Sequence, residues 1–255
     1  MYFVDLNSDL GESFGSYKLG NDEQVLNYVS SVNIACGFHA GDPVVMEKTV
    51  LSAIERSVAI GAHPGYPDLM GFGRRKMQLD ASEARAYMIY QIGALKAFVE
   101  ASGGKLVHVK PHGALYNMAA VDEHLAETLA KAVYDVDREL AFVGLSNSLM
   151  VKAAETVGLR TVHEVFADRA YNSDGTLVAR QVEGALIKDT EVCVSRVLKM
   201  VKDRRITAID GTEIGIRADS VCIHGDSETA LIFARTLRER LEAEGIIIKP
   251  LEKGC

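Results

Sequence analysis

Residues 106–113 read Leu106-Val107-His108-Val109-Lys110-Pro111-His112-Gly113, in which apolar and polar side chains alternate up to a proline and a glycine. Alternation with a period of two is typical of a β-strand, and the proline and glycine predict that the strand ends in a turn. The two valines then share one face, which we expect to pack against helices. The two histidines and the lysine share the other face, so this one segment sends three polar side chains toward a common interior.

Three other segments have the same form, with an apolar run, a histidine and a turn that contains glycine. They are Cys36-Gly37-Phe38-His39-Ala40-Gly41-Asp42, Gly61-Ala62-His63-Pro64-Gly65-Tyr66 and Val221-Cys222-Ile223-His224-Gly225-Asp226. In a parallel α/β protein, the turns that leave the strands gather on one face, and ligands bind there. We therefore expect the four histidines at the floor of an active site.

Strand-like runs alternate with helical stretches along the whole chain. Strands are expected at 2–6, 31–36, 59–62, 106–109, 141–145, 161–166 and 220–223. Helices are expected near 22–30, 42–58, 81–102, 121–137, 147–157, 189–203 and 227–244. Seven βα units in a row predict a parallel β/α barrel with its helices outside. With no linker or repeat in view, we expect a single domain over 1–255.

Two segments interrupt the βα pattern. Residues 64–77 are rich in glycine and proline and contain Arg74, which could clamp an anion or lie on a solvated basic turn. This segment is too long for an ordinary βα turn and indicates a functional loop. Asp210-Gly211 predicts a β-hairpin within 206–217, before the last barrel strand. Residues 246–248 could add a short extra strand.

Composition excludes several classes of protein. The net charge of −7 argues against a nucleic-acid-binding protein. No run of 18 apolar residues indicates a membrane span, and the first residues lack the pattern of a signal peptide, so we expect cytoplasmic residence. The chain contains no GxxxxGK[ST] motif. A self-contained P-loop nucleotide site is therefore excluded.

Strand parity predicts an unusually polar barrel interior. The side chains expected there are Asp5, Asn7, Asp9, His63, His108, Lys110, His112, Glu164, Asp168 and His224. A barrel interior is ordinarily filled by branched apolar side chains, so buried polar groups must be hydrogen-bonded, paired or in contact with a ligand. The set is therefore either an active site or a satisfied polar network without chemistry.

These residue types suit two kinds of chemistry. Histidine beside carboxylates can transfer protons near neutral pH, and an Asp/His set can also hold a divalent metal that activates water. The sequence has no HExxH motif, so a metal is possible but not required. Lys110 could hold a carboxylate or phosphate, or pair with Asp5 or Asp168. Arg169 could pair with Asp168 or face a substrate carboxylate.

Six motifs carry a resemblance to a known family. They are DLNSDLGESFG (5–15), NIACGFHAGDP (33–43), GAHPGYPD with GFGRR (61–75), VKPHGALYN (109–117), EVFADRAY (164–171) and IHGD (223–226). In this order and spacing, from residue 3 to about 250, they closely resemble the LamB/YcsF family, that of the A subunit of ATP-hydrolysing 5-oxoprolinase. Two departures are visible, since Ser8 replaces a usual cysteine and Ser227-Glu228 replaces a usual Thr-Pro.

The resemblance implies a seven-stranded β/α barrel of the glycoside hydrolase/deacetylase type. It also implies that 5-oxo-L-proline (pyroglutamate) is opened to L-glutamate, with ATP as co-substrate hydrolysed to ADP and phosphate. Two partner subunits, B and C, would phosphorylate the lactam oxygen, and this chain would complete ring opening and phosphate loss. The alternatives are a stand-alone metal-dependent deacetylase or amidase, and a binding or regulatory subunit without activity.

This reaction assigns the candidate residues to two groups. The catalytic candidates, for proton transfer, are Asp5, Asp9, His63, His112 and His224. The substrate-binding candidates are Asn7, His39, Arg74, Lys110, Asp168 and Arg169.

Overall fold

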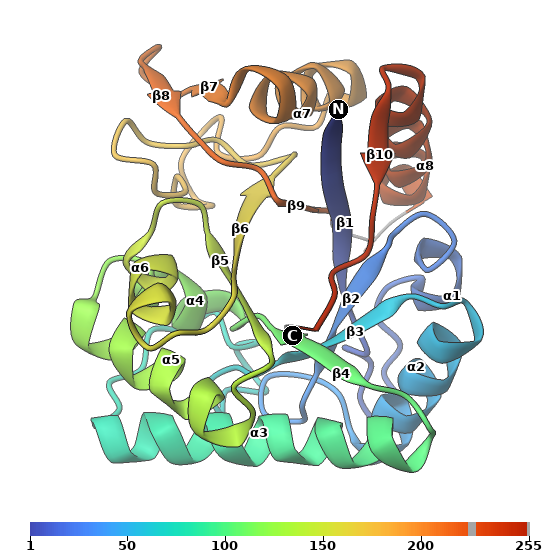
Figure 1. The fold of residues 1–255 in the computed structure, drawn as a ribbon, viewed down its shortest axis with the longest axis vertical. Coiled ribbons are helices and arrows are strands. Elements are labelled where there is room, and N and C mark those ends of the chain that lie inside the picture. Colours follow the sequence, from blue (N-terminus) through green and yellow to red (C-terminus); the bar gives the residue numbers. More distant parts are fainter. Residues whose placement is uncertain (224–227, 254–255) are drawn as a thin grey trace.

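Seven parallel strands form a closed barrel at the centre of the computed structural model, which describes residues 1–223 and 228–253 (Figure 1). They are β1 (Tyr2–Leu10), β2 (Ser31–Ala35), β3 (Ala59–His63), β4 (Leu106–Val109), β5 (Ala141–Leu145), β6 (Thr161–Phe166) and β9 (Ser220–Cys222). β9 pairs with both β6 and β1, which closes the ring. The predicted seven-stranded parallel barrel is confirmed, and β1 continues past its expected end at Leu6.

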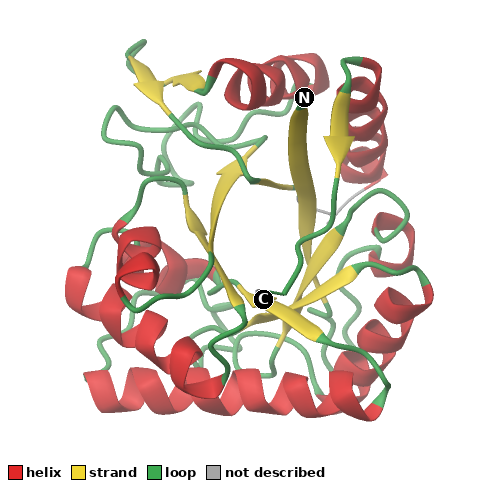
Figure 2. Cartoon of the chain, in the orientation of Figure 1, coloured by secondary structure: helices red, strands yellow, loops and turns green. Residues whose placement is uncertain are grey.

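Helices surround the barrel in Figure 2. They are α1 (Asp22–Val25), α2 (Pro43–Glu55), α3 (Ala81–Ala101), α4 (Gly113–Ala119), α5 (Glu123–Val136), α6 (Leu149–Thr156), α7 (Thr190–Asp203) and α8 (Glu228–Ala243). The Asp42 side chain accepts hydrogen bonds from two backbone N–H groups of α2, and Asp80 with Glu83 forms a capping box on α3. The sequence pattern does not predict α4. None of the described helices is both long and apolar enough to cross a membrane.

The two predicted additions to the barrel are present. β7 (Arg205–Thr207) and β8 (Glu213–Gly215) form an antiparallel hairpin before β9. β10 (Ile246–Ile248) pairs in parallel with the first residues of β1, outside the barrel. After β10, Leu251 packs against Val143 of β5 and its neighbours.

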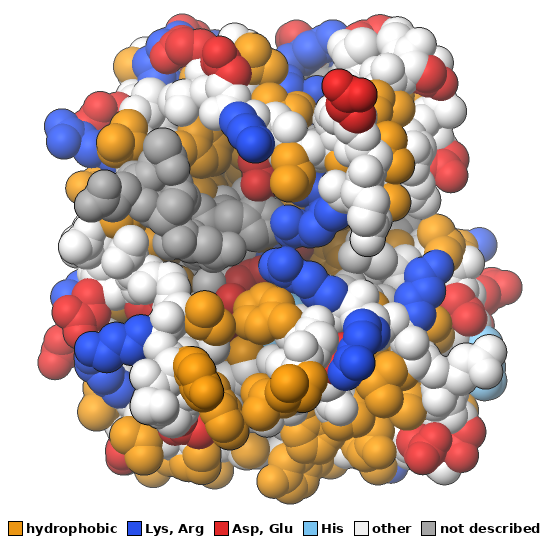
Figure 3. Space-filling model, turned by 180° about the vertical axis from the view of Figure 1, so that it is seen from behind, with side chains coloured by type: hydrophobic (Ala, Val, Ile, Leu, Met, Phe, Trp, Pro, Cys, Tyr) orange, Lys and Arg blue, Asp and Glu red, His pale blue; other side chains and the backbone are white. Residues whose placement is uncertain are grey.

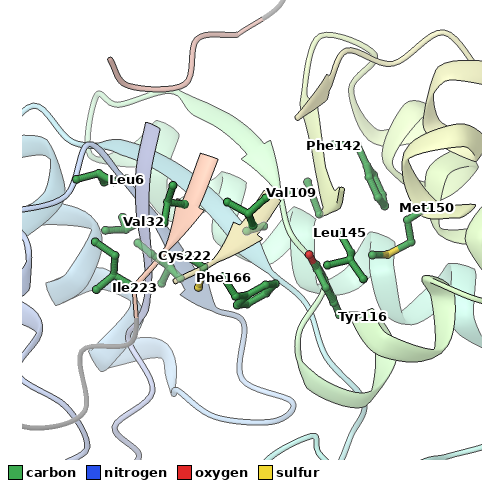
Figure 4. Close-up of a cluster of buried hydrophobic side chains, with 14 of the residues drawn as sticks. Leu6, Val32, Val109, Tyr116, Phe142, Leu145, Met150, Phe166, Cys222 and Ile223 are labelled. Carbon is green, nitrogen blue, oxygen red and sulfur yellow. The ribbon is translucent and has the colours of Figure 1, made fainter. Parts of the chain in front are cut away.

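The main apolar core lies between the strands and the helices. Leu6, Val32 and Val109 point outward from their strands and are fully buried (Figure 4). Phe142 on β5 and Met150 on α6 are buried in the same core. Burial of each such side chain contributes about 1.5–3 kcal/mol. The outer face of the strands thus carries the main apolar packing, and the inner face holds the polar groups together with a smaller apolar cluster of Ala141, Val143, Val162 and Leu251.

Gly61 on β3 lies against the imidazole of His108 on β4, at a position where a larger side chain would overlap the ring. A Cβ atom at residue 61 would lie 2.1 Å from His108 Nε2. Replacing Gly61 with alanine is therefore expected to displace the imidazole and to lower the free energy of unfolding by about 1–3 kcal/mol or more. Urea denaturation would measure this loss.

Gly93 on α3 is a matched control for this substitution. A Cβ there meets no atom within 4 Å, so Gly93→Ala should raise stability by about 0.5–1 kcal/mol. Equal denaturation midpoints for the two variants would contradict the close approach of Gly61 to His108.

Candidate functional site

Asp5 closes one end of the polar interior. Its carboxylate accepts hydrogen bonds from the hydroxyls of Ser30, Ser31 and Ser220. The side chain is buried, and this burial raises the pKa of Asp5 to about 6. Asp5 is not among the residues that line the cavity described below, so it lies deeper in the barrel, where its role is structural.

The raised pKa of Asp5 predicts a specific dependence of stability on pH. Between pH 3.8 and about 6, the folded protein holds a proton that the unfolded chain has released, so this group makes stability fall as the pH rises. The loss approaches about 3 kcal/mol above pH 6. Relative to wild type, Asp5→Asn should therefore gain stability as the pH rises from 4 to 6.5. Urea denaturation across this range tests the expectation, which parallel curves would refute.

Asn7 and Asn33 form the next layer of the interior. Asn7 donates to Ser220 Oγ at 2.7 Å and to Glu164 Oε1 at 3.1 Å, and its Oδ1 accepts from Asn33 Nδ2 at 2.8 Å. Asn33 Oδ1 lies 2.8 Å from His108 Nε2, which therefore donates. This layer is a hydrogen-bonded polar network in which His108 Nδ1 has no partner among the described residues, and like Asp5 it lies below the cavity.

Lys110 links this network to the cavity. Its Nζ lies 2.9 Å from Asp9 Oδ1 and 2.8 Å from Glu164 Oε1, so the lysine pairs with these groups and not with the Asp5 or Asp168 that the sequence suggested. Burial alone would lower the pKa of Lys110, but the surrounding groups, with Asp9 foremost, raise it well above its usual value. Lys110 therefore stays charged and holds Asp9 in place.

Three histidines meet beside Asp9. His63 Nε2 lies 2.9 Å from His112 Nδ1 and 3.3 Å from Asp9 Oδ2. The ring of His39 is stacked on that of His112, with 3.7 Å between the ring centroids. Burial lowers the pKa of His112 to about 3 and that of His39 well below its usual value, so both rings are neutral. The sequence analysis expected His39 at the floor of the site as a substrate-binding candidate, and the structure places it within this cluster.

Glu12 is the member of the cluster that sequence reasoning missed. Its Oε1 lies 3.6 Å from His39 Nε2 and 3.8 Å from His112 Nδ1. Glu12 follows the end of β1, where strand parity no longer applies, and its only signal was its place in the motif at 5–15. Together with His63, these residues form a group that could hold a metal ion, since their ligand atoms all lie within 4.8 Å of one another.

A cavity of about 430 Å³ opens above the cluster. Asp9, Glu12, His63, Lys110 and His112 lie on its floor. Apolar wall residues include Phe72, Leu145, Phe166 and Leu177. Basic side chains also line it, and they are Arg74, Lys76, Arg169 and Arg180. On the face seen in Figure 3, Lys and Arg side chains gather near the middle of the molecule. The excess of cations suits an anionic ligand.

Two loops supply the basic side chains. The predicted functional loop at 64–77 contributes Arg74, whose guanidinium lies 4.9 Å from the centre of the Phe72 ring. The loop after β6 contributes Arg169, which is buried and donates to the carbonyl of Val178. Burial lowers the pKa of Arg169 to about 10. Its neighbour Asp168 is not among the residues that line the cavity.

The structure thus brings together most of the predicted site. Six of the candidates line the cavity, and they are Asp9, His63, Arg74, Lys110, His112 and Arg169. His39 joins them through the cluster, whereas Asp5 and Asn7 lie deeper in the barrel. His224 lies outside the described residues. Neutral imidazoles beside a carboxylate can accept and return protons, and the basic walls can hold anions.

Comparisons with known proteins agree with this architecture. The chain is 59% identical to the A subunit of 5-oxoprolinase from Alkaliphilus metalliredigens, with 96% of both chains covered. It is 56% identical to the corresponding subunit from Pyrococcus abyssi, with 98% of both covered. The crystal structure of a lactam utilization protein from Thermus thermophilus is 45% identical, covers 97% of this chain and 99% of its own, and superposes with a TM-score of 0.92.

A more distant match concerns the fold alone. T48 deacetylase superposes with a TM-score of 0.51 at 12% identity, over 98% of this chain and 88% of its own, so the two proteins share the overall fold. The LamB/YcsF family model matches residues 4–254, nearly the whole sequence. The chain therefore belongs to the LamB/YcsF family.

Proposed function

We propose that this chain is the A subunit of an ATP-dependent 5-oxoprolinase, which cleaves 5-oxo-L-proline to L-glutamate while ATP is hydrolysed to ADP and phosphate. The observation that carries the proposal is a cavity whose floor combines a carboxylate and imidazoles and whose walls carry four basic side chains. Relatives that are 56–59% identical over nearly their whole length are named for this activity.

The site has the groups that this reaction needs. A lactam is a stable amide, and phosphorylation of its oxygen makes the ring carbon electrophilic. Water must then be activated, the leaving nitrogen protonated and two anionic groups held. We assign proton transfer to Asp9 with His63 or His112, because these residues line the cavity and Asp5 does not.

The anionic groups would meet the basic walls. Arg74 and Arg169 are the candidates, and the buried Nε of Arg169 has no hydrogen-bond partner among the described residues. Lys110 would act mainly through Asp9, since its ammonium already contacts two carboxylates. The partner subunits, B and C, would phosphorylate the lactam with ATP, so we place the ATP-consuming step on the complex.

An ATP-dependent 5-oxoproline cleavage assay tests the proposal. The purified chain should form no glutamate alone, and it should form glutamate with stoichiometric release of ADP and phosphate when both partner subunits are added. No glutamate in any combination would defeat the proposal.

The Glu12–histidine cluster favours a second candidate, a stand-alone metal-dependent deacetylase or amidase. The two functions differ in their need for ATP. Cleavage of an acetylated substrate or a lactam by this chain alone, without ATP, would support the second candidate. Dependence on both ATP and the partner subunits would support the first.

A further inference from the structure

The histidine cluster contains an arrangement of hydrogen bonds that the proposed reaction does not require. From it we propose that His63 Nε2, His112 Nδ1, His39 and Glu12 Oε1 bind a divalent transition-metal ion of the zinc class. This inference goes beyond the proposed function, because the ring opening described above contains no step that uses a metal. An ion on these nitrogens would occupy the lone pairs of His63 and His112, so in the metal-bound protein proton transfer would fall to Asp9.

Two backbone carbonyls fix the tautomers of the histidines. His63 Nδ1 lies 2.7 Å from the carbonyl oxygen of Lys110, and His112 Nε2 lies 2.9 Å from that of Phe72. A carbonyl oxygen only accepts, so both of these nitrogens carry a hydrogen. With one hydrogen on each ring, His63 Nε2 and His112 Nδ1 both present a lone pair, although they face each other at 2.9 Å.

Two facing lone pairs repel unless a cation lies between them. Asp9 Oδ2, at 3.3 Å from His63 Nε2, adds a further negative group on the same side. The cation is either a proton, which would make His63 an imidazolium, or a metal ion. The other members of the cluster favour the metal.

His39 provides the independent observation. Its ring is fully buried, and neither of its nitrogens has a hydrogen-bond partner in the described part of the chain. A buried imidazole without a partner is costly, and a bound ion would remove that cost. The distance from His39 Nε2 to Glu12 Oε1, 3.6 Å, is too long for a hydrogen bond and fits two atoms that share one ion.

The surroundings resemble those of metal-binding histidines in general. Such histidines usually donate their second N–H to a carboxylate or backbone carbonyl, as both His63 and His112 do here. Metal–nitrogen bonds of about 2.0–2.1 Å place two ligands of one ion about 3 Å apart. Three imidazoles with one carboxylate favour zinc, cobalt or nickel over magnesium or calcium. His63, His112 and Glu12 line the cavity, so an ion there would be reached from it.

A binding experiment without substrate or ATP tests this site separately from the proposed function. The full-length chain is stripped with a chelator and then titrated with Co²⁺, whose visible absorption reports imidazole ligands, and with Zn²⁺ in equilibrium dialysis. We expect one ion per chain. Glu12→Gln and His112→Asn should each weaken binding by at least about tenfold. His124→Ala, which removes an exposed histidine on α5, should leave binding unchanged.

Circular dichroism of each variant, with and without metal, shows whether it is folded. Glu12→Gln keeps the size of the side chain, so it remains informative if His112→Asn does not fold. A folded wild type that binds no stoichiometric ion would overturn the proposal and leave a shared proton between His63 and His112. Equal affinities of wild type and folded Glu12→Gln would also overturn it.

Discussion

Replacing Lys110 with methionine is expected to lower the free energy of unfolding by about 3–5 kcal/mol. The ammonium lies between two carboxylates, and the Glu164 side chain is completely buried. Without Lys110, Asp9 and Glu164 would face each other without the charge that compensates them, in a layer where Asn7 also donates to Glu164. Methionine keeps a similar length, so the loss would come from the charge and not from a cavity.

Urea denaturation at pH 7 measures this loss, and the exposed pair of Lys48 with Glu23 provides the matched control. That pair has the same geometry at 2.9 Å, but its side chains are 72% and 62% exposed. Because water screens such a pair, Lys48→Met should leave the denaturation midpoint nearly unchanged. Similar midpoints for the two variants would show that burial of the Lys110 ion pairs does not increase their contribution to the free energy of unfolding.

Asp9→Asn and His112→Ala are each expected to reduce ATP-dependent glutamate formation by about 10²–10⁴-fold in the complex with the partner subunits. Asp9 reaches the cavity, and its Oδ2 lies 3.3 Å from His63 Nε2. The asparagine keeps the shape of the side chain but cannot accept a proton. Loss of His112 removes the imidazole that lies next to His63 on the cavity floor.

Steady-state assays on folded variants check this expectation. Circular dichroism and co-elution with the partner subunits would show that fold and assembly are intact, and His124→Ala serves as a variant outside the cavity. Wild-type turnover in both site variants would show that neither Asp9 nor His112 transfers a proton in the reaction. The chain would then be better described as a binding or regulatory subunit.

The sequence predicted the fold well because the strand signals are local. Apolar runs located all seven barrel strands, and Asp210-Gly211 located the hairpin between β7 and β8. The first strand was expected to end at Leu6, because asparagine and aspartate are depleted in strands, although parity had already placed Asn7 and Asp9 in the interior. α4 is only seven residues long, too short for a helical period to stand out.

Strand parity predicted the site residues that lie on or directly after strands, and it could not predict those on the loops. Parity placed Lys110 and Glu164 inside, since each follows apolar neighbours on a strand. It could not place Glu12 or His39, which lie on loops. Gly37 and Gly41 adopt positive φ values around His39, and such a path is set by tertiary packing. The pairing of Lys110 with Asp9 and Glu164 likewise depends on strands that are far apart in the sequence.

Asp5 and the serine hydroxyls that donate to it close one end of the polar interior, and this limits the side from which a ligand can reach the site. At this end Ser31 and Ser220 are fully buried, whereas at the other end the cavity reaches exposed residues such as Arg180 and Gln181. A ligand therefore reaches Asp9 from the cavity side and not from the end that Asp5 occupies. The basic side chains lie on that same side, so phosphate or sulfate in a buffer would compete there with an anionic substrate.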